Sequence, residues 1–101
     1  MKAPQTTAKP VSLRTYVTSR SRAAGWDSDQ FACLDELLWR ESSWRLHNKS
    51  KKSSAYGLFQ LLHLKPGTDR DTQVDKGFKY IKHRYGTPCK ALQHHNKLGW
   101  Y

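Results

Sequence analysis

The stretch Phe31-Ala32-Cys33-Leu34-Asp35-Glu36-Leu37-Leu38-Trp39-Arg40-Glu41-Ser42 decides how this chain folds. Its apolar residues at positions 31, 34, 37 and 38 recur at spacings of three and four, which predicts a helix with one buried face. Glu41 continues that face, because it follows Leu38 by three residues and Leu37 by four. The other two acids of the stretch, at positions 35 and 36, lie off the face and are expected to stay in water.

Glu41 is the candidate functional residue of this helix. A carboxyl group held against Leu37, Leu38 and Trp44 loses solvation of its charged form, so we expect the pKa of Glu41 to be raised. A carboxyl that stays partly protonated near neutral pH can serve as a general acid. The alternative is an ordinary glutamate at a helix end that turns to solvent or pairs with Arg45. The pattern alone leaves both interpretations open.

The composition is that of one small globular domain. The chain has 101 residues, of which 37% are hydrophobic and 26% charged, enough for a modest core. No apolar run approaches the length of a membrane span, so we expect no membrane insertion. Residues 1–10 lack the apolar core of a signal peptide and are expected to form a flexible tail, followed by a single domain over 11–101.

The net charge of +10 predicts an anionic partner. Nucleic acid, anionic lipid and bacterial cell wall would all attract such a field, although a solvated basic surface without a dedicated partner is the alternative. No zinc-finger spacing and no uninterrupted basic helix occur, so a nucleic-acid partner is not required. The five histidines show no paired spacing with carboxylates, and neither a metal site nor a cofactor is expected.

The remaining pattern predicts three more helices around an irregular middle. A first helix is expected over about 11–24, ended by Gly25, and Asp27-Ser28-Asp29 offers an N-cap for the helix that carries Glu41. Residues 42–54 are predicted to be a loop, and residues 55–60 a turn with a short β-like segment.

The last two helices follow from apolar spacing and capping residues. Val74, Phe78, Ile81 and Tyr85 predict a third helix, with Asp71 as its N-cap and Gly86 at its end. Thr87 as N-cap and Pro88 at the first helical position then begin a fourth helix, which is expected to run to about Lys97.

Four segments, in this order, resemble the lytic transglycosylase and goose-type lysozyme superfamily. They are Glu41-Ser42-Ser43-Trp44, Ala55-Tyr56-Gly57-Leu58-Phe59-Gln60, Tyr80-Ile81-Lys82-His83-Arg84-Tyr85-Gly86 and Ala91-Leu92-Gln93-His94-His95-Asn96. The chain is also similar to small lysozyme-like domains of actinobacterial secreted proteins and phages in Cys33-Leu34, in Tyr85-Gly86-Thr87-Pro88-Cys89 and in the closing Gly99-Trp100-Tyr101. The resemblance covers roughly residues 25–101. It implies a mainly α, lysozyme-like domain that cleaves the β-1,4 bond between N-acetylmuramic acid and N-acetylglucosamine in peptidoglycan.

The resemblance also implies roles for single residues. Glu41 matches the catalytic acid, and Ser42 follows it as in the motif. Gly57 matches the glycine whose backbone passes close to the sugar, which a residue with a Cβ would prevent. Gln60 matches the amide that hydrogen-bonds the substrate, and Phe59 takes the place of a methionine under the same sugar.

The match is looser at the aromatic residues and in the last helix. His95-Asn96 stands where many members have Tyr-Asn, so the partner of the catalytic acid is left open by the sequence. Tyr56 is a further candidate contact to substrate, although both it and Phe59 could instead be core aromatics. His95 could equally be an exposed helix residue. Trp44 and Trp100 are candidates for lining the cleft.

Cys33 and Cys89 lie on predicted helices far apart in the chain. The similar secreted domains carry cysteines at both matching positions, which implies a disulfide between the helix of Glu41 and the last helix. Two buried free thiols are the alternative if the protein matures in a reducing compartment.

The number of carboxylates bears on the mechanism. Glycoside hydrolysis usually needs a second carboxylate, and Asp69 is the best candidate among the eight acidic residues, although a structural turn residue is the simpler interpretation. Lytic transglycosylases, which the chain resembles, use one glutamate as acid and then base, and this outcome is favoured. The alternative class is a wall-binding or virion structural module with little catalysis. With no signal peptide in this sequence, delivery to the wall by a phage particle, among other virion proteins, or as part of a larger secreted protein is expected.

Overall fold

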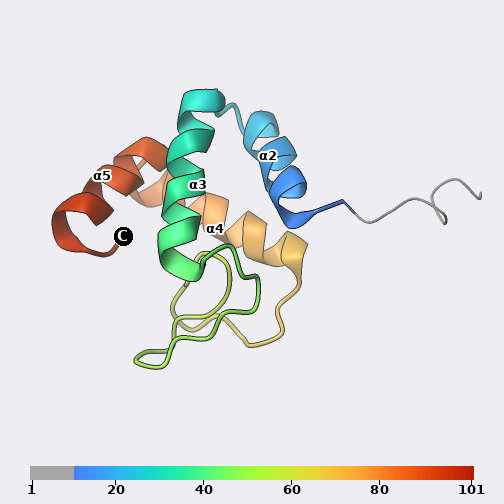
Figure 1. Ribbon diagram of the computed structural model, residues 1–101, viewed down its shortest axis with the longest axis vertical. Coiled ribbons are helices and arrows are strands. Elements are labelled where there is room, and N and C mark those ends of the chain that lie inside the picture. Colours follow the sequence, from blue (N-terminus) through green and yellow to red (C-terminus); the bar gives the residue numbers. More distant parts are fainter. Residues whose placement is uncertain (1–10) are drawn as a thin grey trace, which may run out of the picture.

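A computed structural model describes residues 11–101 of the chain. This part of the chain contains four helices (Figure 1). They are α2 (Leu13–Ala23), α3 (Ser28–Ser42), α4 (Arg70–Arg84) and α5 (Pro88–Leu98). They form one compact, mainly helical domain, which confirms the fold class at that level. The flexible tail predicted for residues 1–10 lies outside the described residues.

Side chains at the N-termini define where two of these helices begin. Asp27 accepts a hydrogen bond from the backbone N–H of Gln30 at 2.9 Å and caps α3. Thr87 accepts one from the N–H of Lys90 at 3.3 Å and caps α5, with Pro88 as the first helical residue. Both caps are as predicted.

The predicted cap of α4 is wrong by two residues. Asp69, not Asp71, is the N-cap, and it accepts hydrogen bonds from the N–H of Thr72 at 3.0 Å and from its hydroxyl at 2.8 Å. The helix begins at Arg70, so only the residue before it has the extended backbone that a cap requires. Asp71 lies in the first turn, where its carboxylate pairs with Arg70 at 3.0 Å.

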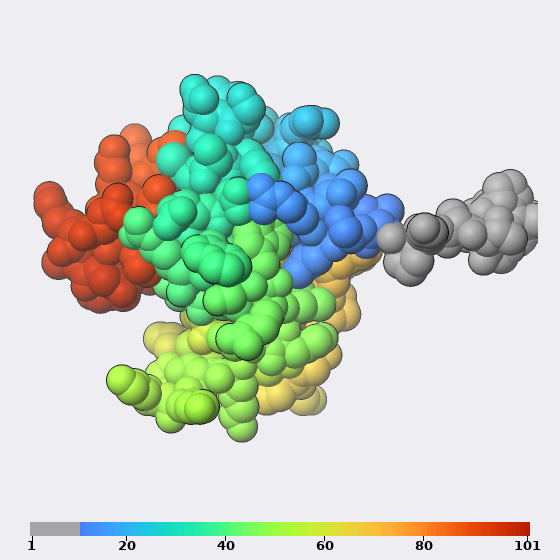
Figure 2. All heavy atoms as spheres, in the orientation of Figure 1, coloured from blue at the N-terminus to red at the C-terminus, as the bar shows by residue number. Residues whose placement is uncertain are grey.

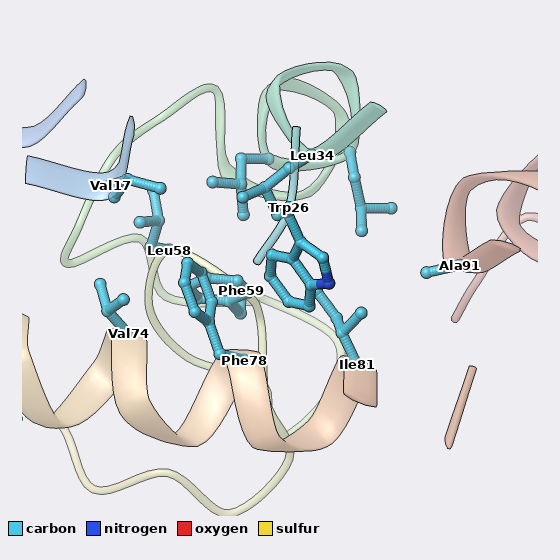
Figure 3. Close-up of a cluster of buried hydrophobic side chains, with 11 residues drawn as sticks. Val17, Trp26, Leu34, Leu58, Phe59, Val74, Phe78, Ile81 and Ala91 are labelled. Carbon is cyan, nitrogen blue, oxygen red and sulfur yellow. The ribbon is translucent and has the colours of Figure 1, made fainter. Parts of the chain in front are cut away.

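One hydrophobic core lies between the helices and the loop that joins α3 to α4. Figure 3 shows the side chains of Val74, Phe78 and Ile81 rising from α4 into this core. The ring of Trp26, just before α3, lies 4.8 Å from that of Phe78, and Phe59 meets Phe78 edge-on at 6.0 Å. The spacing in the sequence therefore predicted the buried face of α4 correctly.

Residues 43–69 form the irregular region drawn in green to yellow in Figure 1. Tyr56 makes isolated antiparallel bridges with Lys49 and with Leu61, and no longer strand forms within residues 11–101. This agrees with the short β-like segment that the sequence predicted. The Ser42 hydroxyl ties this region to the end of α3 by donating to the carbonyl of Leu58 at 2.8 Å.

A disulfide joins α3 to α5 through Cys33 and Cys89. The two helices pack side by side, and in the space-filling view α5 and the C-terminal residues lie in red against α3 (Figure 2). This packing brings the second half of α5 to the end of α3 that carries Glu41. Within residues 11–101, no helix combines the length and the apolar character that crossing a membrane requires.

Candidate functional site

Glu41 and His95 form the centre of the candidate site. The Nε2 atom of His95, on α5, lies 2.8 Å from Oε2 of Glu41, on α3, at hydrogen-bonding distance. Both side chains are largely withdrawn from solvent, with 14% of His95 and 17% of Glu41 exposed. Arg45 donates to the carbonyl of Ser42 and not to Glu41, so the pairing that the sequence left open as an alternative does not form.

The environment raises the pKa of Glu41 above its usual value. Burial is the main cause, because it disfavours the charged carboxylate, and the hydrogen bond with His95 opposes it in part. The raised pKa expected from the helical pattern is therefore present. The Trp44 indole donates to Asp35 at 2.8 Å.

Asp35 is itself less solvated than expected. Its carboxylate accepts two hydrogen bonds from Arg14, at 2.6 and 2.8 Å, as well as that of Trp44. The Arg14 guanidinium lowers the pKa of Asp35. Trp44, a candidate for lining a cleft, is thus engaged with Asp35 and Arg14 and packs against the hydrophobic core.

Tyr101 is a third member of the site that the sequence did not single out. Its hydroxyl donates to the Phe59 carbonyl at 2.7 Å, and its own carbonyl accepts from the Tyr80 hydroxyl at 2.8 Å. Burial raises the pKa of the Tyr101 phenol well above its usual range, and the negative charge of Glu41 adds to this rise. Tyr101 therefore lies within electrostatic reach of Glu41. The only sequence signal was its place in the closing Gly-Trp-Tyr segment, which indicates no position in space.

Tyr101 is one of the residues that line a groove of about 540 Å³. Its walls combine aromatic, aliphatic and basic side chains from the loop, α4 and the C-terminal segment: Gln60, Leu61, Leu62, Lys76, Lys79, Tyr80, His83, Arg84 and Tyr101. This volume lies within the range of small-ligand sites. Glu41 is not one of the wall residues, and Tyr101 is the residue that connects the groove to it.

The backbone beside the site is strained at several residues. Ser43 and Trp44, directly after the helix of Glu41, have φ angles of +52° and +61°, and Gln60 has +52°. Such left-handed conformations are unfavourable for residues with a Cβ and gather at functional sites. Ser43 is the C-cap of α3, and Gln60 is one of the residues that line the groove.

Two of the predicted contact residues lie at the edge of the site. The Gln60 amide nitrogen donates to the carbonyls of Asn48 at 2.7 Å and Gly57 at 2.8 Å, so this residue is held in place on the groove wall. Asn96, exposed on α5, accepts a hydrogen bond from Arg40 and does not face Glu41.

Four other predicted substrate contacts have internal roles, which corrects the expectation. Phe59 is 1% exposed and its ring packs on Gly77, so it offers no face to a ligand. Ser42 is 2% exposed. Tyr56 is buried, with its hydroxyl bound to His47 at 2.7 Å and to the N–H of Gly67 at 3.0 Å.

Gly57 is required by packing within the protein. A Cβ at this position would lie 2.3 Å from the side-chain oxygen of Gln73, and the backbone φ is +91°. The same Gln73 oxygen accepts from the N–H of Leu58 at 2.9 Å. The close approach that the sequence predicted exists, but it is to a buried glutamine.

Trp100, the other proposed cleft tryptophan, lies beside the groove. Its ring packs edge-on against His94 at 4.5 Å, and the Arg84 guanidinium lies 5.4 Å from its centroid. Arg84 also forms part of the groove wall. Trp100 therefore lies next to the groove, in contact with the wall residue Arg84.

No second carboxylate accompanies Glu41. All eight acidic residues of the chain are within the described residues. Asp69, the candidate second acid, is an exposed helix cap whose pKa is lowered by the hydrogen bonds from Thr72. Glu36, Asp71 and Asp75 pair with arginines. Among residues 11–101 no cluster of three or more potential metal ligands occurs.

Comparison of the chain with protein-family models, with curated proteins and with solved structures gave no match. The site itself is that of a helical domain with one largely buried, histidine-bound carboxyl group near a basic groove.

Proposed function

We propose that this chain is a lysozyme-like enzyme that cleaves the β-1,4 bond between N-acetylmuramic acid and N-acetylglucosamine, with Glu41 as its single acid and base. The observation that carries the proposal is the Glu41 carboxyl itself, 17% exposed and 2.8 Å from Nε2 of His95, near a groove wide enough for a ligand; its burial raises its pKa. A buried carboxyl that keeps its proton near neutral pH is the requirement for protonating a leaving oxygen. Burying this group costs stability, and a module that only binds would gain nothing from it.

In the proposed reaction, Glu41 first donates its proton to the glycosidic oxygen, and the bond from that oxygen to the muramic C1 breaks. The neighbouring N-acetyl group stabilises the positive charge at C1. The Glu41 carboxylate then takes the proton of the 6-hydroxyl, whose oxygen attacks C1 and closes a 1,6-anhydro ring. The acid is thereby regenerated without a second carboxylate, in keeping with the engagement of Asp69 as a helix cap.

His95 supports both steps through its contact with Oε2 of Glu41. The Nδ1 atom of His95 is buried without a hydrogen-bond partner in the described residues, which favours the tautomer with its hydrogen on Nε2. This N–H donates to Oε2 when Glu41 is ionised, after the first proton transfer. The other carboxylate oxygen is then the one that exchanges protons with the sugar.

The first test is the substitution Glu41→Gln, with Glu36→Gln as a matched control on the same helix. Because the amide cannot donate the proton, we expect clearing of purified cell walls to fall by about 100-fold or more, with an unchanged circular dichroism spectrum. The control removes an exposed carboxylate and should clear walls at the wild-type rate. Substantial clearing by folded Glu41→Gln would exclude Glu41 as the acid. A folded wild type that binds walls without clearing them would instead favour a binding module.

The products distinguish transglycosylation from hydrolysis. We expect released muropeptides to carry 1,6-anhydromuramic ends, which are lighter by one water than hydrolysed ends in mass spectrometry. Predominantly hydrated ends would mean that water reaches C1. Loss of activity in Asp69→Asn would then identify the group that activates this water.

A further inference from the structure

The α4 wall of the groove carries basic side chains that have no acidic partner. Lys76, Lys79 and His83 follow one another at spacings of three and four, on one face of the helix, with Arg84 adjacent. They span about 10 Å along the helix axis. No carboxylate is among the residues that line the groove.

The acidic residue nearest to them in sequence is already neutralised. Asp75 precedes Lys76 on α4, but its carboxylate pairs with Arg20 of α2. Within residues 11–101, neither lysine nor Arg84 forms an ion pair. Arg84 instead lies over the rings of Tyr80, Tyr85 and Trp100, at 5.4 to 5.8 Å. The positive potential of this groove is therefore available to a ligand.

We propose that this groove binds the carboxylates of the stem peptide that peptidoglycan carries on its muramic sugars, a specificity that rests on the proposed function. Tyr101, which lies within reach of the Glu41 charge, lines this groove, and residues of α4 from Lys76 to Arg84 line it as well. The stem peptide is attached to the sugar whose bond would be cut, so its carboxylates arrive beside Glu41 together with that sugar. The aliphatic and aromatic wall of Leu61, Leu62 and Tyr80 suits the short side chains between them.

Size and position favour a short peptide over the other anions that a basic protein attracts. A volume of about 540 Å³ accommodates a few residues and not a nucleic-acid duplex. The stem peptide is also positioned by the sugar that takes part in the reaction, because it is attached to the muramic residue whose bond Glu41 would cut.

The test compares two preparations of soluble glycan strands, one bearing uncross-linked stem peptides and one stripped of them by an amidase. For wild type at low salt we expect kcat/KM to be about 3- to 10-fold higher on the peptide-bearing strands, through a lower KM, which matches the weak contribution of exposed charge pairs. Lys76→Gln/Lys79→Gln should bring this ratio close to one. The control Lys51→Gln/Lys52→Gln removes the same charge from an exposed loop outside the groove and should retain the preference.

Equal rates of wild type on both preparations would overturn the proposal while leaving the glycosidase function intact. An equal loss of preference in the loop control would overturn it as well, since net charge would then be the cause. If the wild type cleaves neither preparation, calorimetry can compare the affinity of the Glu41→Gln variant for the peptide-bearing and the stripped strands. A glycerol phosphate polymer can be added as a competitor for binding to the groove. If it competes as strongly as peptide-bearing strands do, the groove binds phosphates instead.

Discussion

At the scale of single residues, one hydrogen bond determines how Glu41 can act. Burial raises the pKa of this carboxyl, and His95 offsets part of the rise by donating to the ionised form. Tyr101 adds a buried phenol to the same environment. Because burial outweighs the hydrogen bond, Glu41 stays protonated over a wider range of pH than a surface glutamate does. Its ionised form still has His95 as a hydrogen-bond partner.

His95 is a positioning residue, and its removal should change the pH dependence of activity. His95→Leu removes the donor to the Glu41 anion, so the pKa of Glu41 should rise further. The alkaline limb of the activity profile, where Glu41 loses its proton, should therefore move to higher pH. His95→Gln keeps an N–H donor and should lie closer to wild type. A lower rate with an unshifted profile would show that His95 only maintains packing.

At the scale of elements, α4 is held against the loop by a contact that only glycine permits. A Cβ on Gly77 would lie 2.5 Å from ring carbons of Phe59, which is 1% exposed. Phe78 also packs edge-on against this ring, with 6.0 Å between the ring centroids. This packing turns the Phe59 side chain inward while its carbonyl binds the Tyr101 hydroxyl.

Gly77→Ala should lower the free energy of unfolding by about 1–3 kcal/mol, because Phe59 has no room to move. Helix propensity alone would act in the opposite direction, because alanine is more favourable than glycine inside a helix by about 1 kcal/mol. A lower free energy of unfolding in Gly77→Ala therefore indicates overpacking, and a higher one indicates that helix propensity dominates. Lys76→Ala, at the exposed neighbouring position, is the control and should be close to neutral. Denaturation in urea measures both, and stabilisation by Gly77→Ala would contradict the contact.

The disulfide between α3 and α5 should account for much of the stability of this small domain. Its cysteines are 56 positions apart, and closing a loop of this size is worth about 4 kcal/mol in the loop-entropy model. Reducing agent should therefore lower the melting temperature by at least several degrees. The double variant Cys33→Ala/Cys89→Ala should melt at the lower temperature with or without reductant. Unchanged melting of the reduced wild type would contradict a stabilising role.

At the scale of the whole molecule, the excess of basic residues is the dominant property. The formal charge is +10, and the ion pairs of the described residues engage only four of the eighteen lysines and arginines. Such a field raises the rate of encounter with an anionic surface. For the proposed function, it would hold the protein to the cell wall while the groove selects the substrate.

This attraction should be screened by salt. The Debye length shortens from about 10 Å at 0.1 M to about 3 Å at 1 M ionic strength, so most of the protein bound to purified walls should be released over that range. The Glu41→Gln variant avoids digestion of the walls, and sucrose in place of salt is the control for crowding. Sedimentation of the walls measures the bound fraction. Retention at 1 M salt would show that contacts other than charge dominate.

The sequence by itself determined the four helices, the buried face of α4 and the caps Asp27 and Thr87, because apolar spacing and capping act over a few residues. It also indicated that Glu41 lies on an apolar helix face. It could not place Tyr101 near Glu41 or align the basic residues of α4 with a groove, since these depend on how distant segments pack. It offered Phe59 and Tyr56 as ligand contacts, whereas both are buried. Which atoms meet was decided by the tertiary structure, through α3–α5 packing and the Cys33–Cys89 bond that brings His95 to Glu41.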